Sequence, residues 1–303
     1  MFEKQTLLFY SCMTPLHMGA GTAIGAIDNP IQREAHSGHP LIAGSGIKGA
    51  LRHHLARKWQ QHDDIKRLFG PERDASEHAG ALAFTDAQLV AFPVRSLKNA
   101  FVLATSPYAL ARLKRLAASA GVSAEWTIPE VSAGNAATAS DAALTDGRLI
   151  LEAFEFTGAG DCTDIAAWLA KNALPPGAAH DYFREKLKRD LVVLADSDFA
   201  HFVKNATVVE PHVRINDDTG TADGGGLFYT ESLPPESILA GLVLASIERG
   251  KGREDKLAAE TVLARLVSGN GEAQPGIADA MVQMGGDATT GRGLVLIHPA
   301  QGD

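Results

Sequence analysis

Strand-like and helix-like segments follow one another along this chain without the regular alternation that a parallel, doubly wound sheet requires. Apolar runs rich in β-branched and aromatic residues predict strands, among them 5–14, 148–158, 206–215 and 235–247. Apolar residues at helical spacing predict helices, among them 107–120, 179–195 and 254–268. The pattern favours an α+β fold, and we expect residues 1–303 to form a single domain.

A long glycine-punctuated segment, residues 15–40, separates the first predicted strand from a short strand and an amphipathic helix. Loops of this length are usually functional or disordered. We expect the helix to begin near Ser45 as its N-cap, with Lys48 and Arg52 forming a basic stripe. Its buried face would carry the apolar residues that recur every four positions, namely Ile47, Leu51, Leu55 and Trp59.

The formal charge of −8 argues against a nucleic-acid partner for the chain as a whole, because Lys and Arg supply affinity for phosphate. Residues 1–60 nevertheless hold six Lys/Arg against three acids, a balance of +3 that leaves −11 for the rest. Any polyanion site should therefore be local and N-terminal.

Two distant cysteines, Cys12 and Cys162, suggest neither a disulfide framework nor a zinc site. No apolar run approaches the length of a membrane span, and the N-terminus lacks a signal-peptide layout. These features predict no membrane association and a reducing cytoplasm as the compartment.

The stretch "GSGIKG" at 44–49 matches the dinucleotide fingerprint literally, but no βαβ unit follows it, which disfavours that interpretation. Exposed N–H groups at the helix start, with Lys48 and Arg52, could instead bind phosphate. An ordinary surface helix with solvated cations explains the same residues equally well.

Three other patterns have structural alternatives. "GGDATTGRG" at 285–293 lacks the Lys-Ser/Thr of a P-loop; its glycines suit a tight turn, and Arg292 could also meet a phosphate. The pair His36 and His39 has no third ligand nearby, so a metal site is disfavoured. Asp28 is compatible with an Asx turn before Asn29, as well as with catalysis.

Four segments together resemble a known family, the repeated backbone subunits of type III-B CRISPR (Cmr) effector complexes in the RAMP superfamily. They are "TPLHMGAGTAIGAIDNPIQREAHSGHPLIAGSGIKGALR", "DSDFAHFVKNA", "VRINDDTGTADGGGLFYTESLPP" and "GGDATTGRG". The resemblance implies an RRM-like (ferredoxin-like) β-sheet core with palm, fingers and a protruding thumb hairpin. It places variable insertions at about 60–190 and the thumb at about 208–230.

The same resemblance implies a head-to-tail filament along CRISPR RNA, assembled with other Cmr subunits, that cuts complementary single-stranded target RNA at regular intervals. Asp28 matches the acid most closely tied to cleavage. Carboxylates are weak general bases at neutral pH, so Asp28 would more economically hold Mg²⁺ or Mn²⁺ near the scissile phosphate. His17 and Glu231 match further residues linked to the site. The nucleophile would be the 2′-hydroxyl of the target RNA.

The residues expected to bind the guide backbone are Lys48, Arg52, Ser45 and Gly46, with Arg33, Arg214 and Arg292 as weaker candidates. Three hypotheses follow. The chain is a metal-dependent endoribonuclease within a CRISPR filament, or a scaffold of the same filament without catalysis, or a nucleotide-cofactor enzyme suggested by "GSGIKG" alone.

Overall fold

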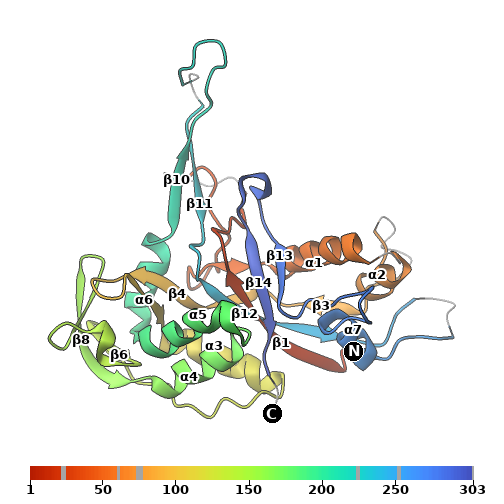
Figure 1. The fold of residues 1–303 in the computed structure, drawn as a ribbon, viewed down its shortest axis with the longest axis horizontal. Coiled ribbons are helices and arrows are strands. Elements are labelled where there is room, and N and C mark those ends of the chain that lie inside the picture. The colour runs from red at the N-terminus through yellow and green to blue at the C-terminus, as the bar shows by residue number, and fades with distance from the viewer. Residues whose placement is uncertain (22–24, 60–61, 73–77, 223–225, 251–253, 302–303) are drawn as a thin grey trace.

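A mixed β-sheet runs through the molecule, with the first and last strands side by side (Figure 1). The computed structural model describes residues 1–21, 25–59, 62–72, 78–222, 226–250 and 254–301. Strand β1 (Lys4–Cys12) lies between β12 (Ile238–Ala245) and β14 (Leu294–Pro299), antiparallel to both, and β14 pairs with β13 (Ala280–Gln283). Residues 7–12 of β1 are all buried, as expected for a central strand covered on both faces.

The sheet continues on the other side of β12. There β4 (Ala87–Arg95) and β3 (Leu82–Phe84) pair with β12, and β2 (Leu41–Ile42) pairs with β4. Beyond β4 the order is β5 (Phe101–Thr105), β9 (Leu191–Leu194), β6 (Asn135–Thr138), β8 (Phe154–Asp161) and β7 (Arg148–Leu151). In the described part of the chain, the pairs β5–β9 and β6–β8 are the parallel ones. The mostly antiparallel sheet confirms the α+β class.

Helices cover both faces of the sheet, because alternate residues of β1 point to opposite sides. Leu8 and Tyr10 belong to one hydrophobic cluster, with α1 (Gly44–Lys58), α2 (His62–Phe69), α6 (Asp196–Asn205) and α7 (Ala259–Val267). Leu7 and Phe9 belong to the other, with α3 (Pro107–Ser119), α4 (Thr163–Asn172) and α5 (Ala178–Asp190). Two short 3₁₀ turns, η1 (Asp141–Ala143) and η2 (Ala288–Thr290), lie in connecting loops.

A two-stranded hairpin, β10 (Val208–His212) and β11 (Phe228–Ser232), projects from the sheet (Figure 1). Its outer part exposes apolar side chains, including Val213, Ile215 and Leu227. Residues 223–225 at its tip lie outside the described part of the chain.

Two elements differ from what the sequence predicts. The segment 148–158 has the pattern of one strand but forms β7 and β8, because the chain reverses at Glu152 with a φ of 51°. The segment 179–195 has the spacing of one helix, but α5 ends at Asp190 and the next four residues form β9. The β-branched pair at 192–193 inserts between β5 and β6, so tertiary pairing overrides helical spacing there.

No helix among the described residues is both long and apolar enough to cross a membrane.

Candidate active site

Leu16 and Asn29 of the glycine-rich segment both lie beside β11 or the residue after it, at the base of the hairpin. Leu16 pairs with Leu233, and Asn29 forms a parallel bridge with Thr230. The amide of Asn29 donates to the carbonyl of Tyr229 at 3.0 Å, and the amide of Glu231 donates to the carbonyl of Asn29 at 2.9 Å. These contacts bring residues 17 and 28 to the same short stretch of β11, although they are 11 positions apart in the sequence.

His17 is held by backbone contacts at its ring and at its own main chain. Its Nδ1 lies 2.6 Å from the carbonyl oxygen of Glu231. A carbonyl oxygen can only accept, so Nδ1 carries the proton in this contact. In the neutral ring Nε2 then holds the lone pair and can accept a proton.

The glycines of "GGDA" form the support behind His17. The amide of Gly286 donates to the carbonyl of His17 at 2.9 Å. Gly285 adopts a φ of +71°, and a Cβ built there would lie 2.3 Å from the same carbonyl oxygen. Glycine is required at 285 because any side chain would push the backbone of His17 away.

Asp28 is exposed and is oriented by the hairpin. The amide of Tyr229 donates to its Oδ2 at 2.8 Å, so this carboxylate reaches across to β11 instead of forming a local Asx turn. Among the described residues, Oδ1 has no hydrogen-bonding partner. Asp28 and His17 line one open pocket of about 370 Å³, together with Gly19, Gly21 and Asn29.

Glu231 lies behind this pocket. Its side chain is 3 % exposed, and its carboxylate accepts from the guanidinium of Arg33, the amide of Ile31 at 3.1 Å and the hydroxyl of Thr207 at 2.8 Å. These contacts favour a positioning role, because both carboxylate oxygens already have donors. A catalytic role for Glu231 stays a prediction.

Arg33 is likewise engaged within the fold. Besides Glu231, its guanidinium donates to the carbonyls of Gly38 and Val203, each at 2.9 Å. The next residue, Glu34, pairs with Arg112 of α3 through both oxygens. Burial alone would raise the pKa of Glu34, but hydrogen bonds from Arg112 and Ser37 hold it below its usual value. Both residues anchor the end of the loop that carries Asp28.

At the start of α1, the predicted phosphate site, the fold already supplies a partner for one backbone amide. The helix begins at Gly44 with Ala43 as N-cap, so the expectation of a Ser45 cap is wrong. The carboxylate of Asp86 accepts from the amide of Gly44 at 2.8 Å and so satisfies one of the free N–H groups.

The side chains of the predicted basic stripe also have protein partners. Lys48 donates to the carbonyl of Leu82 at 3.1 Å, and burial lowers its pKa. Arg52 donates to the carbonyl of Gly70 at 2.8 Å, and its Nε lies 3.6 Å from a carboxylate oxygen of Glu72. Both cations stabilise the packing of α1, and their contact with RNA stays a prediction.

Gly46 and the two remaining arginines occupy different settings. A Cβ on Gly46 would lie 2.6 Å from the terminal methyl of Met18, so this glycine permits close packing next to His17. Arg292 is paired with Glu210 of β10, which ties the glycine-rich loop at 285–293 to the hairpin. Arg214 is exposed on the hairpin.

No group of three or more His, Cys, Asp or Glu side chains that could hold a metal ion exists among the described residues. The pair His36 and His39 packs against Tyr108. Asp28 offers one free carboxylate oxygen, so a divalent ion there would need further oxygens from a bound substrate and from water, which is usual for Mg²⁺.

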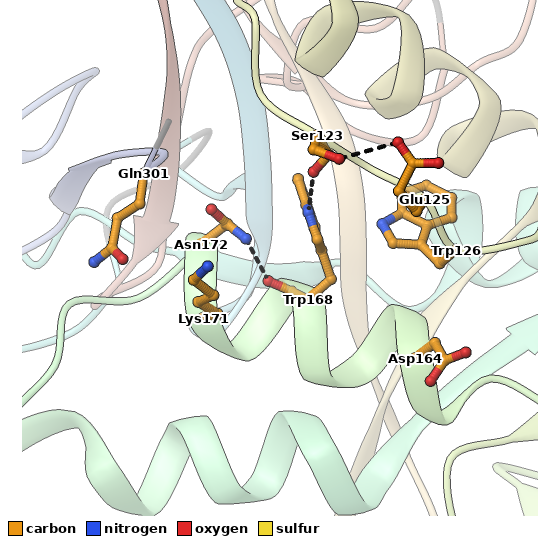
Figure 2. A pocket seen from close by; sticks show the side chains of 8 residues that line it. All are labelled: Ser123, Glu125, Trp126, Asp164, Trp168, Lys171, Asn172 and Gln301. Carbon is orange, nitrogen blue, oxygen red and sulfur yellow. Dashed lines mark hydrogen bonds between the residues drawn. The ribbon is translucent and has the colours of Figure 1, made fainter. Parts of the chain in front are cut away.

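Another open hollow, of about 360 Å³, contains none of the predicted site residues (Figure 2). Trp168 of α4 donates through Nε1 to the carbonyl of Ser123 at 2.7 Å, and Asn172 donates to the carbonyl of Trp168 at 3.0 Å. The bond from Trp168 holds α4 against the segment before β6, and the bond from Asn172 lies within α4.

Sequence reasoning does not identify Tyr229, Gly285 or Arg112 as parts of the site's support. Tyr229 acts through its backbone amide, and Arg112 lies 78 positions from its partner, so no local pattern marks either. The doubled glycine at 285–286 is visible in the sequence, but its partner is not.

Comparison with known proteins gives consistent matches. The family model described as RAMP superfamily matches residues 9–295. The chain is 35% identical over 297 residues to the "CRISPR system Cmr endoribonuclease Cmr4" of Pyrococcus furiosus, covering 97% of this chain and 95% of that protein. It is 38% identical over 88 residues to the "CRISPR system Cms endoribonuclease Csm3" of Enterococcus italicus, covering 25% of this chain and 41% of the relative.

Solved structures agree with these relatives. The structure titled "Crystal structure of oligomeric Cmr4 from Pyrococcus furiosus" superposes with a TM-score of 0.72 at 27% identity and covers 98% of both chains. A chain of "Cryo-EM structure of the Type III-B Cmr-beta bound to cognate target RNA" superposes with a TM-score of 0.74, covers 98% of both chains, and at 22% identity shows the shared fold.

Proposed function

This chain belongs to the RAMP superfamily, as a member of the Cmr4 family, and we propose that it is the repeated backbone subunit of a type III-B CRISPR ribonucleoprotein. In this role it binds guide CRISPR RNA and cleaves complementary target RNA as an endoribonuclease. Family membership confirms the resemblance and the RAMP-type fold expected from the sequence.

One observation carries the proposal. His17 and Asp28 line the same open pocket, and both are held by β11: His17 by the carbonyl of Glu231, Asp28 by the amide of Tyr229. Because β11 is one strand of the projecting hairpin (Figure 1), the pocket lies beside that hairpin, where a displaced nucleotide of the target could enter.

The residues suit transesterification of RNA. The 2′-oxygen attacks the adjacent phosphorus and loses its proton, while the bond from phosphorus to the 5′-oxygen breaks and that oxygen gains a proton. Nε2 of His17 can accept or return the proton, since Nδ1 is committed to Glu231. The products would be a 2′,3′-cyclic phosphate and a 5′-hydroxyl, and DNA targets would resist cleavage.

Asp28 would orient the scissile phosphate through a divalent ion, Mg²⁺ or Mn²⁺, that supplies charge neutralisation when target RNA is bound. The Oδ1 of Asp28, which has no partner among the described residues, could be one ligand of such an ion, with oxygens of the RNA phosphate and water as the others.

We further propose head-to-tail assembly of copies of this chain with other Cmr subunits, in the cytoplasm, with β10 and β11 as the thumb. An oligomeric Cmr4 structure is among the structural matches and supports assembly. Head-to-tail contacts between identical subunits build a filament when the rotation from one subunit to the next does not close into a ring.

The two alternatives are less favoured. The relative with 35% identity is named an endoribonuclease, which favours an enzyme over a scaffold. A dinucleotide site is disfavoured because β2 is two residues long, pairs antiparallel with β4, and α1 is followed by α2 instead of a parallel strand.

The test is cleavage of labelled complementary RNA by the reconstituted complex, comparing wild type with Asp28→Asn in Mg²⁺, Mn²⁺ or EDTA. We expect evenly spaced, metal-dependent products that vanish in the variant while assembly is retained. Asp287→Asn is the matched control, because Asp287 is exposed nearby with a φ of 58° that asparagine tolerates. Unchanged cleavage by Asp28→Asn would leave the chain a scaffold.

A further inference from the structure

A second basic surface lies on α1, away from Lys48 and Arg52. The C-terminal half of the helix and strand β13 enclose an open hollow of about 340 Å³. We call it the α1–β13 hollow, and its lining residues are Ala50, His53, His54, Arg57, Lys58 and Gln283.

The cations of this hollow are not neutralised by the fold. His53, Arg57 and Lys58 are exposed, and within the described ranges none of their side chains has a hydrogen bond or ion pair. This distinguishes them from Arg33 and Arg292, which are paired with carboxylates. Positive charge available to an outside anion is therefore concentrated here.

His54 provides an independent indication of a missing partner. Its Nε2 atom is buried without a hydrogen-bonding partner. Burial lowers the pKa of His54, and the neighbouring charges of Lys58 and Arg57 lower it further. A buried polar atom without a hydrogen-bonding partner is destabilising unless a ligand supplies one, and the positive charges beside it favour an anionic ligand.

The hollow is also connected to the candidate active site through the chain. Gln283 lines the hollow and donates through Nε2 to the carbonyl of Arg292 at 2.6 Å. Two residues later, Gly285 and Gly286 pack against His17. An extended polyanion bound in the hollow could therefore continue along the end of β13 and reach the pocket lined by His17 and Asp28.

We propose that the α1–β13 hollow binds the phosphodiester backbone of single-stranded RNA through Arg57 and Lys58, with His53 and His54 as additional donors. The inference rests on the proposed function. It assigns an RNA contact to Arg57 and Lys58, which are separate from the basic stripe of Lys48 and Arg52. Backbone contacts of this kind add affinity and salt dependence without sequence preference.

The test uses the full-length chain and a labelled single-stranded RNA titrated at several salt concentrations. The variant Arg57→Glu with Lys58→Glu should weaken binding on the order of a hundredfold at low salt. The slope of log affinity against log salt should fall by roughly 1.4, about 0.7 for each phosphate that the variant no longer neutralises. Arg57→Lys with Lys58→Arg should keep near wild-type affinity.

The matched control is Lys98→Glu with Arg115→Glu, an equal charge change at exposed positions on other elements. This control should retain the wild-type salt slope. A second experiment measures how tightly target RNA binds to the guide-loaded complex. If the Arg57→Glu, Lys58→Glu variant weakens binding only in this second experiment, the hollow contacts the target strand. If it weakens binding both here and in the titration of the chain with single-stranded RNA, the hollow contacts the guide.

Two results would overturn the inference. The first is a folded Arg57→Glu, Lys58→Glu variant that binds RNA with wild-type affinity and wild-type salt slope in both experiments. That result would show that RNA does not contact the hollow, and it would leave the proposed function intact. Equal weakening by the control variant would show a general charge effect. A wild-type chain that binds no RNA, alone or assembled, would instead contradict the proposed function itself.

Discussion

The carbonyl oxygen of Glu231 lies 2.6 Å from Nδ1 of His17, so a backbone atom of the hairpin determines which nitrogen of the histidine faces the pocket. The side chain of the same residue points away and binds Arg33. One residue of β11 thus orients the histidine with its backbone and secures the loop with its carboxylate.

His17→Asn tests the role of Nε2. The asparagine amide can still donate to the carbonyl of Glu231, but it has no nitrogen lone pair that can accept a proton as Nε2 of His17 does. We expect cleavage to slow by about 10²- to 10⁴-fold, the usual contribution of a general acid or base, with guide binding unchanged. Single-turnover cleavage by the assembled complex measures this, and a rate within a few-fold of wild type would exclude proton transfer by His17.

Glu231→Gln tests the positioning role. The substitution removes the charge opposite Arg33 and sets an amide where three donors converge, so it should lower the free energy of unfolding by roughly 1–3 kcal/mol. Urea denaturation measures the change. In a double-mutant cycle with Arg33→Gln, the two effects should not add, because each substitution breaks the same pair. If Glu231→Gln instead unfolds at the wild-type urea concentration but no longer cleaves RNA, the result would indicate a direct catalytic role for Glu231.

Gly285→Ala should abolish cleavage without touching a substrate atom. Its Cβ would lie 2.3 Å from the carbonyl of His17, which must shift and move the ring out of place. Gly291→Ala is the matched control: its φ of +80° carries similar backbone strain, but no atom lies within 4 Å of the added Cβ. Equal activity of the two variants in the cleavage assay would contradict the supporting role of Gly285.

Glu236→Gln should change how stability depends on pH. Burial raises the pKa of Glu236 to about 7, with a smaller opposing effect from Lys186. The folded state therefore keeps its proton while the unfolded state loses it, and wild-type stability should fall as pH rises from about 4.5 to about 7. Melting temperatures measured across this interval should fall less in Glu236→Gln, and parallel curves would contradict the assignment.

Sequence alone determined the elements with strong local signals. The fourfold spacing of Ile47, Leu51 and Leu55 predicts the buried face of α1, and all three are fully buried. The loop carrying His17 and Asp28 is also identifiable, because glycines and single polar residues in one long segment are a local pattern. The end of α5 cannot be identified from the sequence, because residues 191–194 form a strand only when they pair between β5 and β6.

The tertiary structure decided which charges face inward. The sequence predicts phosphate contacts for Lys48 and Arg52, yet their donors reach carbonyls 34 and 18 positions away, and Arg33 meets a carboxylate 198 positions away. A charged side chain takes whichever partner the fold brings within hydrogen-bonding distance, and such partners are distant in sequence. Local sequence thus determined which residues form the loop and the helix, and long-range packing decided which of their charges remain available for RNA.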